Sequence, residues 1–362
     1  MIQWAFKTVP TLIYAMKHLY NWSMKQFIFA IVLSLMFNTT AYSASKKIAI
    51  LYDEVFLTHF TGENHPENAE RLKTVISDLR KNNELLPYLL WPPIKDINKP
   101  ILELVHDTNY IALVEKEVAA IRGGEISYLS TGDTVISKNS LTVAKKAVAA
   151  AITGVDGIMN DQYGSAFVLS RPPGHHATTS KGMGFCIFNQ AAIAARYVQD
   201  KYNLKNILIV DFDVHHGNGT QDIFYDDATV FYFSAHQHPL YPQTGRPEEK
   251  GINNGLGYTL NVDMQKGAGD AEFLKVFAEK LVPIMDKFKP EFIIISAGFD
   301  SHKGDLLGGL EYTDKGYKQV AGLLKKIALK YASGRHLYIL EGGYVPDNIS
   351  RSTQAILSVM AE

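Results

Sequence analysis

The sequence has a single cysteine and almost no net charge, and each scarcity excludes a class of protein. One cysteine cannot form an internal disulfide bond, so the chain is not a disulfide-stabilised scaffold. The 36 Lys and Arg residues against 37 Asp and Glu residues leave a net charge of -1, which provides no general electrostatic attraction to nucleic acid. Hydrophobic residues make up 46% of the 362 residues. This fraction excludes a disordered chain and allows a sizeable buried core.

The N-terminal stretch before Asp53 contains no acidic residue and includes an apolar run from Phe27 to Phe37. That run is shorter than the roughly 20 residues of a membrane-spanning helix, so no stable membrane span is expected. A basic start, a short apolar stretch and a small-residue exit are typical of a secretory signal peptide, which we expect over residues 24–45. The protein would then be secreted or periplasmic, and an uncleaved segment that anchors it to a membrane is the alternative. Residues 1–23 form an upstream extension to which no role is assigned.

From residue 46 onward, strand-like and helix-like patterns alternate. Several of the strand-like runs are continuously apolar, which is typical of strands buried on both faces. Strands are expected at 48–53, 165–170, 206–212, 229–235, 292–298 and 337–343, and helices at 72–79, 141–159, 187–202, 270–288 and 314–332. The alternation predicts one α/β domain over residues 46–362, with a mostly parallel sheet flanked by helices on both faces. The longest loop is expected at 236–257, and a loop of that length is usually functional or disordered.

Polar clusters follow the predicted strands at their C-terminal ends. The segments concerned are 171–176, 211–216, 300–302 and 341–344. In open α/β sheets, ligands bind outside the carboxyl ends of the strands. We therefore expect these four segments to converge on one crevice.

The segment after the third predicted strand contains the strongest candidate for a metal site. Asp211, Asp213 and His215 alternate along the chain and so share one face of an extended segment. Asp300 ends another apolar strand and supplies a second carboxylate, so that Asp213, His215 and Asp300 make three ligands of a type that zinc accepts. Burying such charge without a counter-ion is costly. A capping or ion-pair cluster at the strand ends is the alternative, and His302 is a second-ranked ligand.

Two further segments carry side chains suited to proton transfer and charge stabilisation. His175 and His176 follow a rigid Pro-Pro-Gly turn, and histidine is the side chain that exchanges protons near neutral pH. Tyr344 follows Gly342-Gly343 and can present a phenol hydroxyl where an oxyanion develops. Taken singly, a surface histidine pair and an ordinary half-buried tyrosine are the alternatives.

Together these segments resemble the histone deacetylase family, which has the arginase–deacetylase fold. The matching segments occur in family order, and the similarity covers about residues 46–360. They are Arg171–Ala177, Gly184-Phe185-Cys186, Asp211–Gly219, Ser296–Asp300 and Glu341–Tyr344. His65-Pro66-Glu67 with Arg71, and the segment 304–309, look like the class II branch and its bacterial relatives.

The resemblance implies a hydrolase that uses zinc to remove acetyl or other acyl groups from lysine side chains of proteins or peptides. It implies one zinc ion per chain, with Asp213, His215 and Asp300 as ligands. His176 would be the general base that takes a proton from the attacking water, and His175 its electrostatic or proton-donating neighbour. The remaining implied roles are that Asp211 orients His175, that Asn218 contacts His176, and that Tyr344 polarises the amide carbonyl.

The resemblance also implies a narrow acyl-lysine tunnel. Phe185, with Gly184 beside it, and Tyr241 would form its walls, and Asp133 would clamp the substrate backbone at the rim. Leu307 stands where a polyamine enzyme would have an acidic gate. An apolar residue at this position favours a substrate whose neighbouring part is uncharged.

A structural potassium ion is implied near Asp211 and Ser234. The alternatives to a lysine deacetylase are an amidohydrolase of acetylpolyamines or other small acylamines and, in a different class, a non-catalytic acyl-lysine binding module. Arginase-type enzymes bind two manganese ions with more carboxylates, and the sequence offers no second Asp-rich ligand set.

Overall fold

The computed structural model describes residues 47–362, which belong to a compact unit that comprises Lys46–Glu362. The expected upstream extension and signal peptide lie outside the described residues. Among the described residues, no helix has both the length and the apolar character that crossing a membrane requires.

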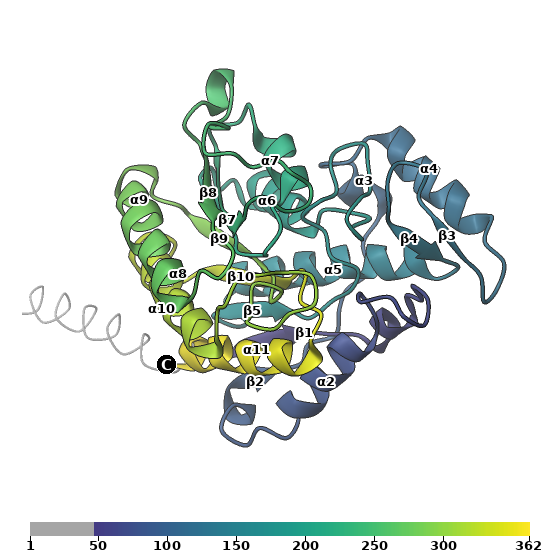
Figure 1. Cartoon of the computed structure of the whole chain (residues 1–362), viewed down its shortest axis with the longest axis horizontal. Helices are drawn as coiled ribbons and strands as arrows, with labels where there is room; N and C mark the ends of the chain where they lie inside the picture. Colours follow the sequence, from purple (N-terminus) through teal and green to yellow (C-terminus); the bar gives the residue numbers. More distant parts are fainter. Residues whose placement is uncertain (1–46) are drawn as a thin grey trace, which may run out of the picture. The chain divides into compact units, whose positions relative to one another are not determined.

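An eight-stranded sheet forms the centre of the domain (Figure 1). All of its pairings are parallel. The strand order is β2 (Leu89–Leu90), β1 (Ile48–Leu51), β5 (Ser165–Val168), β10 (His336–Leu340), β9 (Phe292–Ala297), β6 (Ile207–Asp211), β7 (Val230–Gln237) and β8 (Thr259–Met264). The inner six strands are the six predicted ones, and all their residues are buried. The predicted parallel α/β architecture is therefore confirmed.

Helices cover the sheet in two groups (Figure 1). One group comprises α2 (Glu70–Leu79), α8 (Asp270–Val276), α9 (Val282–Phe288), α10 (Asp314–Tyr331) and α11 (Pro346–Ala361), and the other α5 (Ser140–Met159), α6 (Gln190–Tyr202) and α7 (Asn218–Phe224). The domain also contains the short α3 (Lys99–Leu102), α4 (Thr108–Ala119) and an antiparallel hairpin of β3 (Ile126–Tyr128) and β4 (Val135–Ser137). Among the described residues, three short 3-10 helices are η1 (Glu54–Thr58), η2 (Leu86–Tyr88) and η3 (Asn253–Gly255).

Alanine and glycine allow α5 to pack close to the sheet. A Cβ atom added at Gly154 would lie 2.8 Å from Leu337, and one at Gly157 would collide with the ring of Tyr163. Gly154 therefore allows direct contact with β10, and Gly157 leaves room for Tyr163, which precedes β5.

The bounds of most predicted elements differ from the structure by a few residues, and two elements differ more substantially. The helix expected over 270–288 is divided into α8 and α9 by a π-helical turn, Phe277–Leu281. Pro283 lies in the first turn of α9 and has no backbone N–H to continue the preceding helix. The long loop begins after Gln237, later than expected, because β7 continues to that residue.

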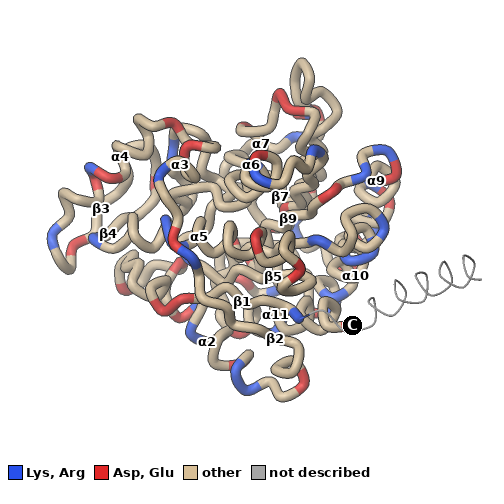
Figure 2. The backbone as a smooth tube through the Cα atoms, turned by 180° about the vertical axis from the view of Figure 1, so that it is seen from behind, with Lys and Arg blue, Asp and Glu red and all other residues tan. Residues whose placement is uncertain are grey.

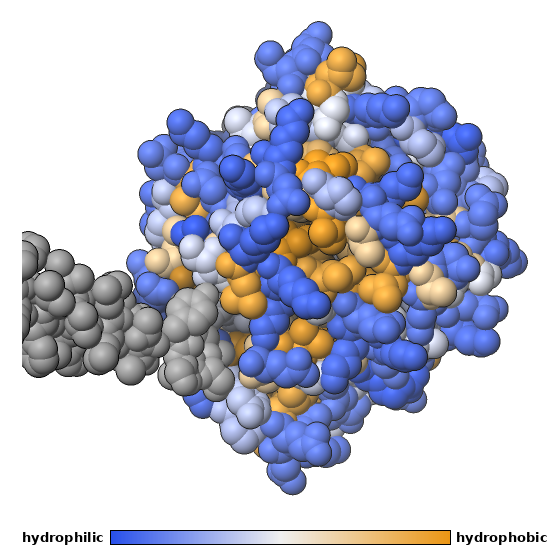
Figure 3. Space-filling view, turned by 90° about the vertical axis from the view of Figure 1, so that its left-hand side faces the viewer, coloured by the Kyte–Doolittle hydropathy of each residue, from blue (hydrophilic) through white to orange (hydrophobic). Residues whose placement is uncertain are grey.

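The face that Figure 3 shows is mostly hydrophilic, with a hydrophobic area in its middle. Lys and Arg residues are interspersed with Asp and Glu residues along the outer helices and loops (Figure 2). Interspersed charges provide little attraction to a polyanion, as the near-zero net charge predicts.

A buried ion cluster joins three segments near the ends of the strands. The carboxylate of Glu67 contacts Arg171 Nε at 2.6 Å and Arg71 Nη1 at 2.9 Å, and all three side chains are fully buried. Burial raises the pKa of Glu67, but the two guanidinium groups outweigh it and hold that pKa at about 2. Arg71 also donates to the carbonyl oxygens of Glu341 and Gly343. The cluster therefore fixes the segment that follows β10.

We predict that Glu67→Gln destabilises the domain by about 3–5 kcal/mol, because it leaves two buried guanidinium groups without a counter-charge. Urea denaturation of the two proteins measures the difference. The matched control is Glu70→Gln, which removes an exposed partner of Lys73 and should leave the free energy of unfolding nearly unchanged. An equal decrease in the free energy of unfolding for the two variants would contradict a stabilising role of the buried cluster.

Candidate metal centre and active site

The four polar segments that follow the strands meet at one edge of the sheet. The strands β5, β10, β9 and β6 are consecutive neighbours in the sheet and run parallel, so their carboxyl ends lie side by side. Each of these strands leads directly into one of the predicted segments. The crevice expected from the sequence is therefore present in the structure.

Three buried side chains form a group that fits a divalent metal ion. Ligand atoms of Asp213, His215 and Asp300 all lie within 4.8 Å of one another. His215 Nδ1 is 3.0 Å from Asp213 Oδ1 and 3.2 Å from Asp300 Oδ2. Ligands bound tetrahedrally to zinc at about 2.0–2.1 Å are separated by about 3.3 Å, so these distances match a zinc site.

A cation would also stabilise the buried negative charges of this group. Asp300 Oδ2 is buried and has no hydrogen-bond partner. Burial, followed by the charge of Asp213, raises the pKa of Asp300, because two carboxylates share one enclosed site. A divalent cation would balance both carboxylates. His302, the second-ranked ligand, instead lies 3.2 Å from Asp314.

Backbone groups and glycines hold the two carboxylates in place. Gly342 N–H donates to Asp213 Oδ2 at 2.8 Å, and Val214 N–H donates to Asp300 Oδ1 at 2.9 Å. A Cβ atom at Gly342 would lie 2.1 Å from Asp300 Oδ2, and one at Gly298 would lie 2.2 Å from Asp213 Oδ2. These two positions therefore need glycine, because the backbone approaches the two carboxylates closely.

The two neighbouring histidines have different electrostatic environments. Burial lowers the pKa of His175, but Asp211, whose Oδ2 lies 3.0 Å from His175 Nδ1, and Asp213 raise that pKa well above the usual 6.5. Burial and the neighbouring His175 and His215 lower the pKa of His176 well below 6.5. The pKa values of the two histidines are therefore shifted in opposite directions, which favours the neutral form of His176 and the charged form of His175.

Asn218 determines which nitrogen of His176 is basic. His176 Nδ1 lies 2.8 Å from Asn218 Oδ1, and the amide of Asn218 faces Met183 Sδ. Because the Asn218 carbonyl oxygen can only accept, Nδ1 carries the proton and Nε2 is free to take another. Asp211 and Asn218 thus make the contacts predicted for them.

Tyr344 contributes a buried phenol to the site. Burial and the charge of Asp300 raise the pKa of Tyr344 well above its usual value, so the hydroxyl remains protonated and able to donate. Arg71 lies over the Tyr344 ring at 5.2 Å, and the preceding Gly343 has a φ of 109°. A Cβ atom at Gly343 would lie 2.9 Å from Phe299 Cβ, so glycine is needed here for the chain to turn.

A cavity of about 270 Å³ brings the predicted substrate-binding residues together with the chemical ones. It is lined by Asp133, His176, Gly184, Phe185, His215, Leu240, Tyr241, Leu307 and Tyr344. Asp133 Oδ1 accepts the Gly184 N–H at 2.7 Å and so fixes the turn that presents Phe185. Leu240 was not singled out from the sequence, because it lies in the long loop, where no pattern distinguishes it.

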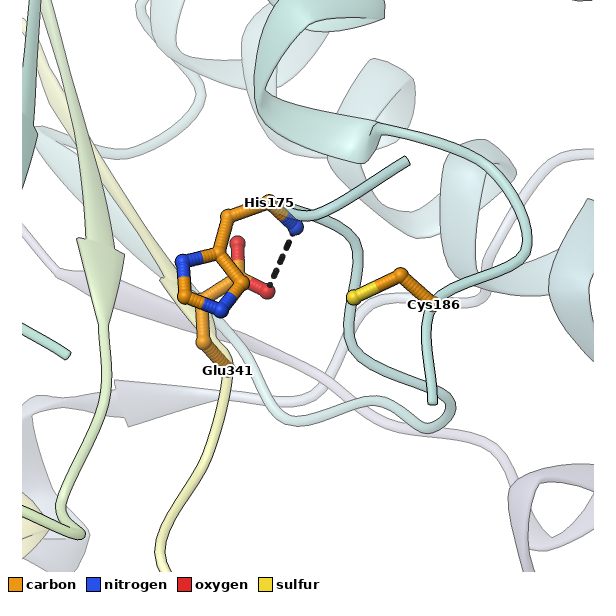
Figure 4. A group of neighbouring side chains, drawn as sticks. All are labelled: His175, Cys186 and Glu341. Atoms are coloured by element: carbon orange, nitrogen blue, oxygen red, sulfur yellow. Dashed lines mark hydrogen bonds between the residues drawn. The ribbon is translucent and has the colours of Figure 1, made fainter. Parts of the chain in front are cut away.

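Glu341 has a structural role at the site that its sequence motif did not reveal. Its Oε2 accepts the N–H groups of Gly174 and His175 at 2.7 and 3.1 Å, and its Oε1 accepts the Ser296 hydroxyl at 2.9 Å. Burial raises the pKa of Glu341 to about 7. Figure 4 shows this carboxylate beside His175 and Cys186. Since both oxygens already accept hydrogen bonds, Glu341 acts as a support for the histidine turn and is a poor metal ligand.

Comparisons with known proteins agree with this geometry. The family model of the histone deacetylase domain matches residues 65–360. A probable deacetylase of Archaeoglobus fulgidus is 38% identical over 315 residues, which cover 86% of each chain. Histone deacetylase 10, chloroplastic, of Oryza sativa is 36% identical over 80% of this chain and 68% of its own.

The fold is shared with a solved structure of the same group. The crystal structure of the HDA15 HD domain superposes with a TM-score of 0.81 at 36% sequence identity, over 88% of this chain and 89% of that one. The sheet, the helices around it and the matched sequence span thus agree with the arginase–deacetylase fold. The chain belongs to the histone deacetylase family.

Proposed function

We propose that the protein is a zinc-dependent amidohydrolase that removes acetyl or other acyl groups from lysine side chains of proteins or peptides. Membership of the family implies deacetylase activity. The observation that carries the finer proposal is the grouping of Asp213, His215 and Asp300 beside a cavity lined by His176 and Tyr344. That arrangement combines a metal site, a base and an oxyanion donor at one point.

Asp213, His215 and Asp300 would hold the zinc ion, since three protein ligands with an open position are typical of catalytic zinc. When bound, zinc supplies Lewis-acid chemistry: it polarises the substrate carbonyl and makes water acidic enough to ionise near neutral pH. His176 Nε2 accepts a proton from the attacking water, because Asn218 fixes the proton on Nδ1. The histidine pair then returns a proton to the departing amine.

Tyr344 stabilises the charge that develops on the carbonyl oxygen. Its hydroxyl is protonated and lines the cavity with His176 and His215. A preorganised donor of this kind lowers the barrier by about 3 kcal/mol. Acetate, or a longer acid, and a free amine are the products.

The cavity lining supports an acyl-lysine substrate. Phe185, Tyr241 and Leu307 provide apolar walls for an aliphatic chain, and Asp133 is exposed at the rim. Leu307 offers no carboxylate for the second cation of an acetylpolyamine. That alternative substrate is therefore less favoured than acyl-lysine.

We further propose that residues 24–45 act as a signal peptide and that the protein is secreted or periplasmic. The potassium ion near Asp211 and Ser234 stays a prediction. In the structure, Ser234 Oγ lies 2.8 Å from His236 Nδ1.

We expect the purified protein to hydrolyse an acetyl-lysine peptide at least about tenfold more efficiently than acetylated putrescine, because Leu307 offers no carboxylate for the cationic end of acetylated putrescine. A chelator should abolish the activity, and added zinc should restore it. Release of free amine, with and without chelator, is the measurement. Preference for acetylated putrescine would favour the polyamine alternative, and peptide binding without turnover by the zinc-loaded protein would favour the binding module.

Two variants separate the metal ligands from the base. His176→Ala should retain one zinc ion per chain and lose about 100-fold or more in kcat, because only the base is removed. Asp300→Ala should lose the zinc ion itself, because one of its three ligands is absent. Metal analysis after dialysis, together with kcat, distinguishes the two outcomes. Zinc loss in His176→Ala would mean that His176 is a ligand.

A further inference from the structure

Asp305 connects two residues that line the active-site cavity. It lies with Leu307 in the loop between Asp300 and α10, and only 9% of its surface is exposed. Its Oδ2 accepts the backbone N–H of Tyr344 at 2.7 Å, and its Oδ1 accepts that of Leu307 at 3.1 Å. One buried carboxylate therefore joins the residue that carries the phenol to a residue of the tunnel wall.

The loop that carries Asp305 is itself anchored on both sides. Asp305 N–H donates to the carbonyl of His302 at 3.1 Å, and Gly309 N–H donates to Gln237 Oε1 at 2.7 Å. A Cβ atom at Gly308 would lie 2.2 Å from the carbonyl oxygen of Asp300, so the loop packs directly against the candidate ligand segment. These contacts give the carboxylate a fixed position.

The backbone before Tyr344 is held by other groups. Arg71 contacts the carbonyls of Glu341 and Gly343, and Gly342 N–H donates to Asp213. Asp305 supplies the acceptor for the N–H of Tyr344, two residues after Gly342. Both oxygens of Asp305 accept backbone N–H groups, so the carboxylate fixes the backbone position of the tyrosine relative to Leu307.

We propose that Asp305 is a positioning residue that sets the phenol of Tyr344 and the Leu307 wall relative to each other. It does not line the cavity and acts through these two neighbours. The inference rests on the proposed function, because the position of the Tyr344 phenol affects the reaction rate only if the phenol takes part in the reaction. A misplacement of about 1 Å in an active site costs about 100-fold in rate.

A double-mutant cycle tests this role. Asp305→Asn keeps the size of the side chain but cannot accept at both atoms, and it should lower kcat by about tenfold or more while KM changes by less than about twofold. Tyr344→Phe should itself lower kcat by about 100-fold or more. When Asp305→Asn is added to Tyr344→Phe, kcat should fall by less than a further factor of about two, since no phenol hydroxyl remains to be placed. An equal loss in both backgrounds would overturn the proposal.

Hydrogen exchange provides a readout that does not depend on activity. In Asp305→Asn, amide exchange should accelerate in residues 304–309 and 341–346, the two segments that the carboxylate joins. Unchanged exchange in 341–346 would overturn the proposal. Should the wild-type protein hydrolyse no acyl-lysine peptide, the proposed function fails, whereas the exchange result still decides whether Asp305 holds Tyr344.

Asp227→Asn is the matched control. Asp227 also accepts a backbone N–H, that of Thr229 at 2.7 Å, but it lies before β7, at the opposite edge of the sheet. This variant should lower thermal stability without changing kcat or the exchange of residues 341–346. If Asp305→Asn does not fold, Asp305→Glu keeps the charge and displaces the carboxylate, and the same cycle with Tyr344→Phe applies to it.

Discussion

The structure depends on the enclosure of two carboxylates and one imidazole at a single point. Asp213 and Asp300 are fully buried, and His215 lies within 3.2 Å of both. Uncompensated buried charge is costly, and the proposed cation would compensate the charge of this group. Glycines at 298 and 342 allow the backbone to approach the carboxylates, and peptide N–H groups fix their orientation.

Other buried carboxylates around the centre bind backbone N–H groups or a buried guanidinium group. Glu341 accepts the His175 N–H, and Asp305 accepts the Tyr344 N–H. Glu67 pairs with Arg71, which in turn donates to the backbone of the segment after β10. The side chains of the candidate site come from separate strand ends, so each end needs its own anchor. The anchors explain how loops at one edge of a sheet can provide the fixed geometry that catalysis requires.

The sequence predicted many of the parts of the molecule that have a local pattern, although the helices α4 and α11 were not predicted. Continuous apolar runs indicated the six inner strands, and alternate spacing placed Asp213 and His215 on one side of the chain. The edge strands β2 and β8 were missed, because β2 has only two residues and β8 is buried at only some of its positions. The contacts of Glu341 and Asp305 were also beyond prediction from sequence, since each carboxylate bonds to backbone groups that are remote along the chain.

X-ray absorption spectroscopy at the zinc edge tests the central claim most directly. Zinc bound by Asp213, His215 and Asp300 should show only oxygen and nitrogen neighbours, at about 2.0–2.2 Å. Cys186 is the only cysteine of the chain, and it lies in the separate group with His175 and Glu341. A sulfur neighbour at about 2.3 Å would therefore place the ion on Cys186 and contradict the account.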